Sequence, residues 1–213
     1  MSSLRITEIF YSLQGESNTV GIPTVFIRLT GCPLRCVYCD TAYAFTGGKK
    51  LSINDIITEA EQYNTPFITV TGGEPLAQPG CIELLTELLN KNFKVSLETS
   101  GAIDISNVDQ RTVKVMDLKT PGSGELNKNL YENIQYLNSK DQVKFVIGTN
   151  EDYNWSKAIL TEYALSDRCE ILFSPVMGLQ NPTELAEKIL RDRLPVRFQI
   201  QLHKLLWDDA QGK

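Results

Sequence analysis

Three cysteines that stand close together are the strongest chemical feature of the sequence. Cys32, Cys36 and Cys39 have the spacing C-x₃-C-x₂-C. Three thiolates do not complete the tetrahedral site of a structural zinc ion. A cubane [4Fe–4S] cluster is usually held by four cysteines, so on three it would leave one iron free for an outside ligand. The spacing therefore predicts a cluster that takes part in chemistry.

A structural zinc site is the alternative that this spacing leaves open, with Cys81, Cys169 or His203 as its fourth ligand. A second motif, residues 72–75 with the sequence Gly-Gly-Glu-Pro, argues against it. Paired glycines let the backbone approach a ligand because no Cβ intervenes, and a structural zinc ion needs no such pair there. Otherwise Cys81 and Cys169 are expected to be small buried apolar residues.

Composition limits the class of protein. The chain has 213 residues, 42% of them apolar and 22% charged, which is typical of one globular domain over residues 1–213. Its net charge of −5 argues against binding to nucleic acid or to a membrane surface. An odd number of cysteines, three of them bunched, disfavours a disulfide framework. Without a visible signal peptide or long apolar run, a cytoplasmic protein is expected.

Strand and helix patterns alternate along the chain, which predicts βα units and a parallel sheet. A short strand or hairpin is expected within 4–21, followed by strands at 24–30, 66–71, 94–99, 112–119, 142–147, 170–175 and 196–201. Helices are expected at 52–63, around 82–89, at 128–138, at 151–165 and from 181 onward. Ser52 and Asp55 fit a capping box, and Asn181 before Pro182 fits a helix start. The strands are too few for a closed eight-fold barrel, so we expect an open partial barrel or a doubly wound sheet.

In both architectures the functional groups gather at the carboxyl ends of the strands. The unusual sequences occur there, each at the carboxyl end of an expected strand. They are the cysteine loop, residues 71–75, 98–101 and 117–119, and the segment 174–177. One pocket at that end of the sheet is therefore expected to collect them.

The cysteine loop and the Gly-Gly-Glu-Pro motif, at the ends of the first two parallel strands, resemble the radical S-adenosylmethionine (SAM) superfamily. This resemblance implies a partial (β/α)₆ barrel and a three-cysteine [4Fe–4S] cluster whose open iron chelates SAM. It also implies reductive cleavage of SAM to a 5′-deoxyadenosyl radical, which abstracts a hydrogen atom from the substrate. The cofactor supplies the difficult chemistry, and the protein positions and shields it.

A narrower resemblance covers nearly the whole chain. Residues 12–16, 26–33, 39–41, 71–75, 98–101 and 201–204 resemble the 7-carboxy-7-deazaguanine synthase family. The resemblance implies conversion of 6-carboxy-5,6,7,8-tetrahydropterin to 7-carboxy-7-deazaguanine with loss of ammonia, in queuosine biosynthesis. It further implies dependence on Mg²⁺, a homodimer, and a flavodoxin- or ferredoxin-type electron donor.

The resemblance also implies roles for individual residues. Substrate binding is expected from Leu13, Gln14, Gly15, Glu16, Arg28, Thr71 and His203, and Mg²⁺ binding from Thr41. A planar guanidinium such as that of Arg28 suits the pterin carboxylate, although a plain salt bridge is the alternative. Thr41 could instead cap the loop backbone. His203 is expected on one strand face with Gln199 and Gln201, closing the substrate end of the pocket.

The SAM-binding residues are expected around the glycine pair. They are Tyr38, Gly72, Gly73, Glu74, Glu98, Ser100, Asp117, Lys119, Ser174, Pro175, Val176 and Met177. Tyr38 would contact the adenine, with loop packing as its alternative role. The sequence departs from some family members at Asp117-Leu118, where those have Ser-Pro. Buried polar groups also pair purely for structure, so these positions are open.

Two other functions share part of this pattern. An activating enzyme for glycyl-radical enzymes would also have the cluster loop, but it needs a groove for a protein substrate. A zinc- or cluster-binding regulatory module would bind metal without turnover.

Metal analysis separates these readings. We expect protein prepared without oxygen to be brown and to contain about four irons per chain, because a cubane cluster holds four. Iron and zinc measured by inductively coupled plasma mass spectrometry would check this. Stoichiometric zinc without iron would contradict the cluster assignment.

Overall fold

The structure, a computed structural model, describes residues 2–208 and 210–212. These residues form a nine-stranded sheet in the order β3-β1-β2-β4-β5-β6-β7-β8-β9. The strands are β1 (Ser3–Leu13), β2 (Pro23–Leu29), β3 (Lys49–Ser52), β4 (Phe67–Gly72), β5 (Lys94–Thr99), β6 (Val113–Asp117), β7 (Gln142–Ile147), β8 (Glu170–Pro175) and β9 (Arg197–Phe198). The α-helices are α1 (Ile53–Glu61), α2 (Gly80–Asn90), α3 (Asn150–Glu162), α4 (Pro182–Asp192) and α5 (Leu202–Trp207).

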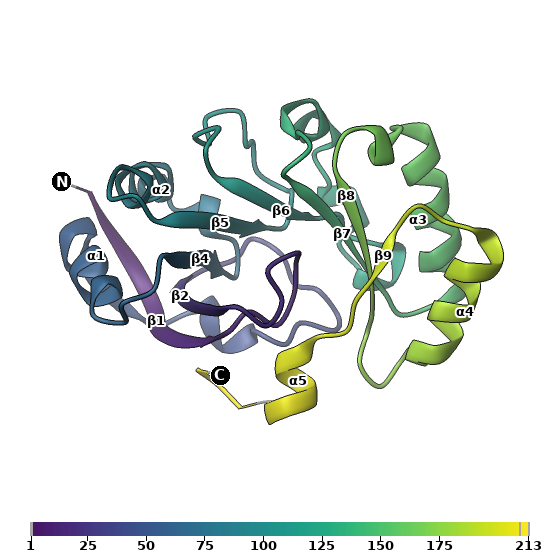
Figure 1. Ribbon diagram of the computed structural model, residues 1–213, viewed down its shortest axis with the longest axis horizontal. Coiled ribbons are helices and arrows are strands. Elements are labelled where there is room, and N and C mark those ends of the chain that lie inside the picture. Colours follow the sequence, from purple (N-terminus) through teal and green to yellow (C-terminus); the bar gives the residue numbers. More distant parts are fainter. Residues whose placement is uncertain (1, 209, 213) are drawn as a thin grey trace.

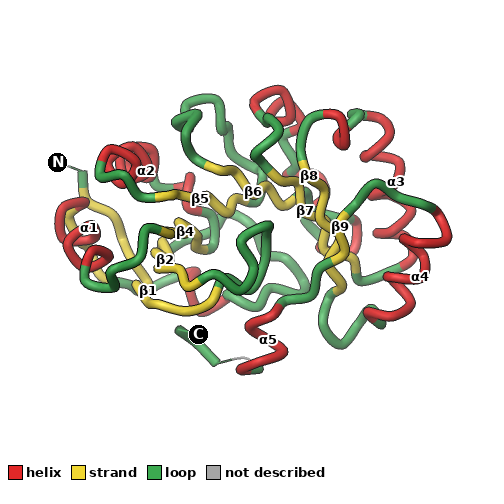
Figure 2. Tube along the Cα trace, in the orientation of Figure 1, coloured by secondary structure: helices red, strands yellow, loops and turns green. Residues whose placement is uncertain are grey.

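Strands β2 and β4 to β9 run parallel to one another in the sheet, whereas β1 is antiparallel to β2 and to β3. The sheet curves, with α1 and α2 outside its first half and α3 and α4 outside its second half (Figures 1 and 2). This is the expected open partial barrel with an N-terminal strand extension. In the described ranges, no helix has the length and apolarity needed to cross a bilayer.

The helices begin where their side chains satisfy free backbone groups. Ser52 and Asp55 form the predicted capping box at the start of α1. The Asn181 side chain accepts a hydrogen bond from the backbone N–H of Thr183 at the start of α4. Such caps stabilise a helix end by roughly 1 kcal/mol. Both predicted helix starts are confirmed.

Two expected elements are wrong. The segment 128–138 forms a 3₁₀ helix, Tyr131–Tyr136, rather than an α-helix. The side-chain amide of Asn133 donates to the carbonyl oxygens of Gly101 and Ile103, 3.0 and 2.8 Å away. These long-range hydrogen bonds hold the segment against the preceding loop and outweigh its helical propensity.

The final strand is shorter than expected. β9 contains only Arg197–Phe198, and His203 lies in α5. His203 therefore does not share a strand face with Gln199 and Gln201. The backbone N–H of Leu202 donates to the Gly15 carbonyl, 2.9 Å away. Because of this hydrogen bond, the chain turns and leaves the edge of the sheet.

The connection between β1 and β2, residues 14–22, crosses the open side of the barrel (dark purple in Figure 1). The backbone N–H of Ser17 donates to the Gln199 side chain at 3.0 Å, and that of Asn18 donates to the Gln142 side chain at 2.9 Å. We call residues 14–22 the closing loop. The closing loop joins the first strands of the sheet to the last ones. Hydrogen bonds between strands do not make this connection.

The glycine pair allows the ends of β2 and β4 to meet. A Cβ on Gly72 would lie 2.5 Å from the carbonyl oxygen of Leu29, and one on Gly73 would lie 2.5 Å from the Cβ of Cys32. The N–H of Glu74 also donates to the Gly31 carbonyl, 2.9 Å away. The cysteine loop is thus packed directly on the backbone of the glycine pair. The position of the loop therefore requires that residues 72 and 73 have no side chains.

A Gly73→Ala substitution is expected to destabilise the protein by about 1–3 kcal/mol, because the added methyl group overpacks against Cys32. It should also lower the iron bound per chain, because the loop must shift. Chemical denaturation and iron analysis check both effects.

Gly80→Ala is the matched control. Its Cβ would meet the flexible end of Leu4 at 3.2 Å, and alanine is favoured by about 1 kcal/mol over glycine within a helix. Equal stability and equal iron content in the two variants would contradict the role given to Gly73.

Candidate active site

A pocket of about 1090 Å³ lies at the carboxyl ends of the parallel strands. The predicted site residues on its wall are Leu13, Gln14, Gly15, Glu16, Arg28, Cys32, Cys36, Tyr38, Cys39, Thr41, Thr71, Gly72, Gly73, Glu98, Ser100, Asp117, Lys119, Val176, Met177 and His203. The structure therefore brings together residues from both ends of the chain, as the strand-end argument expected.

Three predicted SAM-binding residues do not line the pocket. Ser174 and Pro175 are buried within β8, behind its wall. Glu74 is fully buried, and its carboxylate accepts hydrogen bonds from Thr99 and from the backbone and hydroxyl of Ser100 at 2.5–3.0 Å. Its carboxylate is fully occupied by protein donors, so Glu74 holds the end of β5 in place.

The three cysteines are free thiols on a loop that reaches over the pocket. Burial raises the pKa of the Cys32 and Cys36 thiols. The loop is fixed by hydrogen bonds from the Cys39 N–H to the Cys36 carbonyl at 3.2 Å and from the Val37 N–H to the Ser123 carbonyl at 2.9 Å. The thiols are partly buried on the pocket wall.

Within the described ranges, no three His, Cys, Asp or Glu side chains converge on a point where a single metal ion could sit. Mononuclear zinc needs that convergence. A cubane cluster is several atoms wide, so its thiolates stand apart around it, and soft sulfur ligands suit iron. The three thiols lie beside the glycine pair, residues 72–73, and therefore fit an iron–sulfur cluster.

The side of the pocket that is predicted to bind SAM contains a largely buried ion pair. Lys119 Nζ lies 3.0 Å from Asp117 Oδ2. Burial disfavours the charged lysine, but Asp117 and Cys36 outweigh it and raise the pKa of Lys119. Across from them, the Tyr38 hydroxyl lies 3.3 Å from the Thr120 hydroxyl. Burial raises the pKa of Tyr38 to about 12, so this phenol stays neutral.

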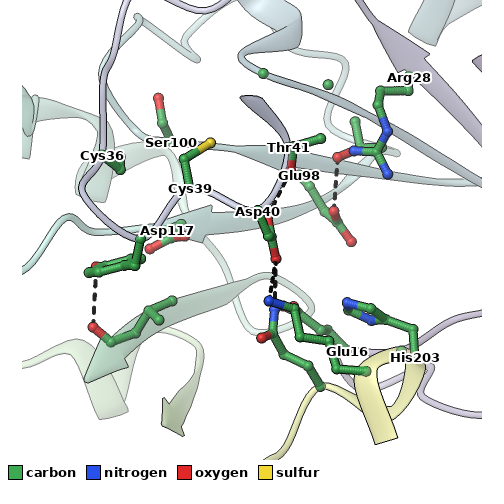
Figure 3. Close-up of a pocket in the computed structure, with 18 of the residues that line it drawn as sticks. Glu16, Arg28, Cys36, Cys39, Asp40, Thr41, Glu98, Ser100, Asp117 and His203 are labelled. Carbon is green, nitrogen blue, oxygen red and sulfur yellow. Dashed lines mark hydrogen bonds and ion pairs between the residues drawn. The ribbon is translucent and has the colours of Figure 1, made fainter. Parts of the chain in front are cut away.

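The opposite side is organised around Glu16 (Figure 3). Glu16 Oε2 lies 2.6 Å from Lys144 Nζ, and Glu16 Oε1 accepts from the Gln201 side chain at 2.7 Å. The two charged side chains are only 12% and 14% exposed. Burial opposes ionisation of Glu16, but Lys144 outweighs it, and the net effect lowers the pKa of Glu16. Glu16 is therefore a fixed carboxylate.

Glu98 is the second buried carboxyl group in the pocket. It accepts from the Thr71 hydroxyl at 2.9 Å and from the Gln14 side chain at 3.3 Å. Burial raises the pKa of Glu98, and the nearby charge of Glu16 raises it further. Two neighbouring carboxyl groups with opposite shifts can play different roles in one pocket.

Arg28 faces the pocket from β2. Its Nε donates to Glu8 Oε1 at 2.7 Å, and the Tyr43 hydroxyl donates to the same oxygen at 2.8 Å. The guanidinium carbon also lies 5.8 Å from the centroids of the Phe10 and Tyr43 rings. The alternative salt bridge is present, but it uses only Nε, so the rest of the guanidinium stays available for a carboxylate.

Thr41 begins the short 3₁₀ helix Ala42–Phe45 but makes no side-chain cap. Its hydroxyl instead donates to Asp40 Oδ1 at 2.8 Å, and Lys204 Nζ lies 3.2 Å from Asp40 Oδ2. Burial disfavours the Asp40 carboxylate, but Lys204 and Thr41 outweigh it and lower the pKa of Asp40 to about 2. Two adjacent oxygen donors at the pocket wall fit Mg²⁺, a hard ion that keeps several waters.

The C-terminal segment closes the pocket. His203 in α5 packs on Gly15, where any Cβ would collide with the imidazole Nδ1. Asp208, Ala210 and residues 211–212 also line the pocket. The glycine at position 15 is thus required by the approach of His203, which enters from α5 in Figure 3.

Comparison with known proteins identifies the family. A family model described as the radical SAM superfamily matches residues 26–163. The 7-carboxy-7-deazaguanine synthase of Chlorobaculum tepidum is 43% identical over 98% of this chain and 97% of that protein. That of Koribacter versatilis is 38% identical over 96% of this chain and 97% of its own length. The chain belongs to the 7-carboxy-7-deazaguanine synthase family.

Solved structures agree on the fold. QueE from Escherichia coli superimposes with a TM-score of 0.78 at 22% identity, over 94% of this chain and 95% of that one. Streptococcus suis SuiB bound to S-adenosylmethionine has a TM-score of 0.56 at 13% identity, over 80% of this chain and 45% of that one. At these identities the likeness establishes the partial-barrel fold alone.

Several residues of the pocket wall or its supports were not predicted as site residues from the sequence. Lys144, Gln201 and Lys204 hold Glu16 and Asp40 in place, and Tyr43 holds Glu8. Lys144 stands inside a predicted strand and points to the barrel interior, so alternation along that strand was the one signal for it. Gln201 was expected only as a neighbour of His203 on a strand face, and it lies instead at the start of α5. Lys204 belongs to α5 and Tyr43 to a short 3₁₀ helix, where no periodic pattern places a side chain.

Removing the lysine of the Glu16–Lys144 pair is expected to lower the free energy of unfolding. Lys144→Met should destabilise the protein by about 3–5 kcal/mol, because it leaves the Glu16 charge buried without a partner. The double variant with Glu16→Gln should recover much of that loss, since no charge then remains. Denaturant unfolding of both single variants and the double variant measures the coupling.

The pH dependence provides a control. The pKa of Glu16 is lowered, so its contribution is present above its unfolded value of 4.5 and is lost as pH falls through the folded value. The pKa of Lys144 is raised, so its contribution is present below 10.5 and is lost at still higher pH. A wild-type and double variant with identical acid unfolding profiles would contradict the pairing.

Proposed function

We propose that this chain is a radical SAM lyase that converts 6-carboxy-5,6,7,8-tetrahydropterin to 7-carboxy-7-deazaguanine with loss of ammonia. Membership of the synthase family supports the reaction. One observation on the structure carries the proposal: the cluster cysteines and the substrate residues expected from the sequence line one pocket. A pocket closed over by α5 and the segment after it suits a small molecule better than a protein substrate, against the activating-enzyme alternative.

The cofactors are a [4Fe–4S] cluster, SAM and Mg²⁺. When bound, the cluster and SAM supply a 5′-deoxyadenosyl radical that takes a hydrogen atom from the substrate. The thiolates of Cys32, Cys36 and Cys39 hold the cluster. The backbone of Gly72 and Gly73, on the pocket wall beside the cysteine loop, would receive the amino group of SAM.

The SAM nucleoside is held beside the cysteine loop, between Tyr38 and the ends of β5, β6 and β8. Ser100 and Lys119 bind its polar groups, with Asp117 keeping the lysine charged. The ring of Tyr38, fixed by its hydroxyl, stacks near the adenine together with Val176 and Met177. These side chains orient SAM and exclude water from it.

The charged side chains of the pocket suggest how the substrate is held. Arg28 presents the rest of its guanidinium to the pterin carboxylate, because Glu8 uses only Nε. Glu16 offers an acceptor to the polar edge of the pterin. The Gln14 side chain donates to Thr69 and Glu98, so its part is to position Glu98. Thr41, with Asp40 beside it, binds Mg²⁺, which offsets the negative charge of the substrate carboxylate. His203 and the segment after it cover the substrate.

We also propose a homodimer and a flavodoxin- or ferredoxin-type electron donor in the cytoplasm. Val37, between two cluster cysteines, is 78% exposed. An exposed loop beside the cluster site supports the approach of a donor protein to that side of the pocket.

The proposed reaction is tested by incubating anaerobic enzyme with SAM, a reductant, Mg²⁺ and 6-carboxytetrahydropterin. Deazapurine product is expected by chromatography and mass spectrometry. Arg28→Gln should lower kcat/KM about 10–100-fold, because a charged hydrogen bond contributes roughly 1.5–3 kcal/mol. Most of this loss should appear in KM, with cluster content unchanged.

Arg168→Gln, on the surface and outside the pocket wall, is the matched control and should match the wild type. Enzyme with an intact cluster that cleaves SAM but makes no deazapurine would reject this reaction. Equal kinetics for the two arginine variants would reject Arg28 as the carboxylate site.

A further inference from the structure

A second cavity, of about 620 Å³, opens at the amino ends of the strands. The first residues of four successive parallel strands line it: Phe67, Lys94, Val113 and Gln142. It therefore lies at the opposite end of the barrel from the active site, and among the residues lining the two cavities only Val115 is shared. Its volume is in the usual range for a small-molecule site.

The charge of this cavity is one-sided. Lys94, Arg111 and Lys140 line it, and no described aspartate or glutamate does, although the chain as a whole is acidic. Arg111 is paired with Asp109 at 2.7 Å, so the two lysines contribute most of the uncompensated charge. Burial lowers the pKa of Lys140. A bound anion would reverse that cost, because an opposite charge favours the ammonium form.

The walls of the cavity are apolar and partly aromatic. Phe67, Phe93, Val95 and Val113 supply them. The ammonium group of Lys94 lies 4.9 Å from the centroid of the Phe67 ring, which holds a cation beside an aromatic face. A flat ring carrying an acidic group matches both features.

A buried hydrogen-bond donor in the cavity has no partner. Gln142 is fully buried, and its Oε1 accepts from the Asn18 backbone N–H at 2.9 Å. Its Nε2 makes no hydrogen bond with any described residue. Buried amides are rarely left unpaired in native proteins, so this donor points to an acceptor on a ligand.

We propose that this cavity binds a small planar anion, with an aromatic ring between the apolar walls and a carboxylate or phosphate beside Lys94 and Lys140. The Gln142 amide would donate to an acceptor on the ring. A carboxylated pterin or deazapurine and a purine mononucleotide share this chemistry.

Such a ligand would act on the active site through the closing loop. Ser17, Asn18 and Thr19 line the second cavity, and Glu16 beside them lines the first. A ligand that contacts residues 17–19 stabilises the loop in the position that presents Glu16 to the substrate. Occupation of the second cavity is therefore expected to lower KM for the substrate and to leave kcat little changed.

Calorimetric titration of reconstituted, SAM-saturated enzyme tests the binding. Oxidised 6-carboxypterin and guanosine monophosphate are the two probes, and inorganic phosphate is the probe without a ring. The titrations use Arg28→Gln enzyme, in which pterin binding at the active site is weakened. At least one aromatic probe is expected to bind this enzyme more tightly than phosphate, and which one binds identifies the source of the ligand.

Lys140→Glu should weaken that binding at least tenfold. Lys128→Glu reverses an exposed lysine that lines neither cavity and should change it less than twofold. In otherwise wild-type enzyme the kinetic test uses guanosine monophosphate, because 6-carboxypterin also competes for the active site. Where guanosine monophosphate is the probe that binds, it should lower KM, and Lys140→Glu should abolish that effect while basal turnover stays the same.

Failure of both aromatic probes to bind below millimolar concentration would overturn the proposal, as would equal losses in the two charge-reversal variants. Binding of phosphate as tight as that of the aromatic probes would overturn the assignment of a planar ligand. These titrations require no turnover, so they are separate from a failure of the lyase assay.

Discussion

The ion pair between Glu16 and Lys144 is the interaction on which the pocket depends. The two residues are 128 positions apart, one in the closing loop and the other in β7. An open barrel has no strand ladder across its gap, so side chains must fix the closing loop. Because both charges are nearly buried, either one alone would be strongly disfavoured. The pair therefore fixes the loop and the orientation of the Glu16 carboxylate together.

Lys144 also connects the two ends of the active site. Its Nζ lies 3.8 Å from Asp117 Oδ2, and Asp117 in turn pairs with Lys119. Charges of alternating sign thus run along the pocket wall from Lys119 to Glu16. Glu98 is a carboxyl group that is not paired with a cation of this row. This agrees with the raised pKa of Glu98. The departure from some family members at Asp117 gains a physical reason, since Asp117 stabilises Lys144 as well as Lys119.

The sequence predicted what is encoded locally. The cysteine loop, the glycine pair and the strand ends depend on neighbouring residues, and the pocket at the carboxyl ends of the strands follows from parallel pairing. What it missed depends on distant contacts. The Asn133 amide overrides helical propensity, and the Glu74 carboxylate, on the most recognisable motif, turns inward to β5. His203 was placed in a strand because nothing local shows that Gly15 would turn the chain into α5.

The wall between the two cavities explains how one loop can serve both. The Gln14 amide donates to the Thr69 hydroxyl at 3.0 Å and to Glu98 at 3.3 Å, and the Thr69 hydroxyl lies 2.8 Å from that of Ser96. Small hydroxyl side chains fill this layer of the barrel, where large aliphatic residues would close the interior. Buried polar groups whose hydrogen bonds are satisfied make such a layer rigid. A ligand that fixes the closing loop at the amino end of the barrel would therefore also fix Gln14 against Glu98 at the other end.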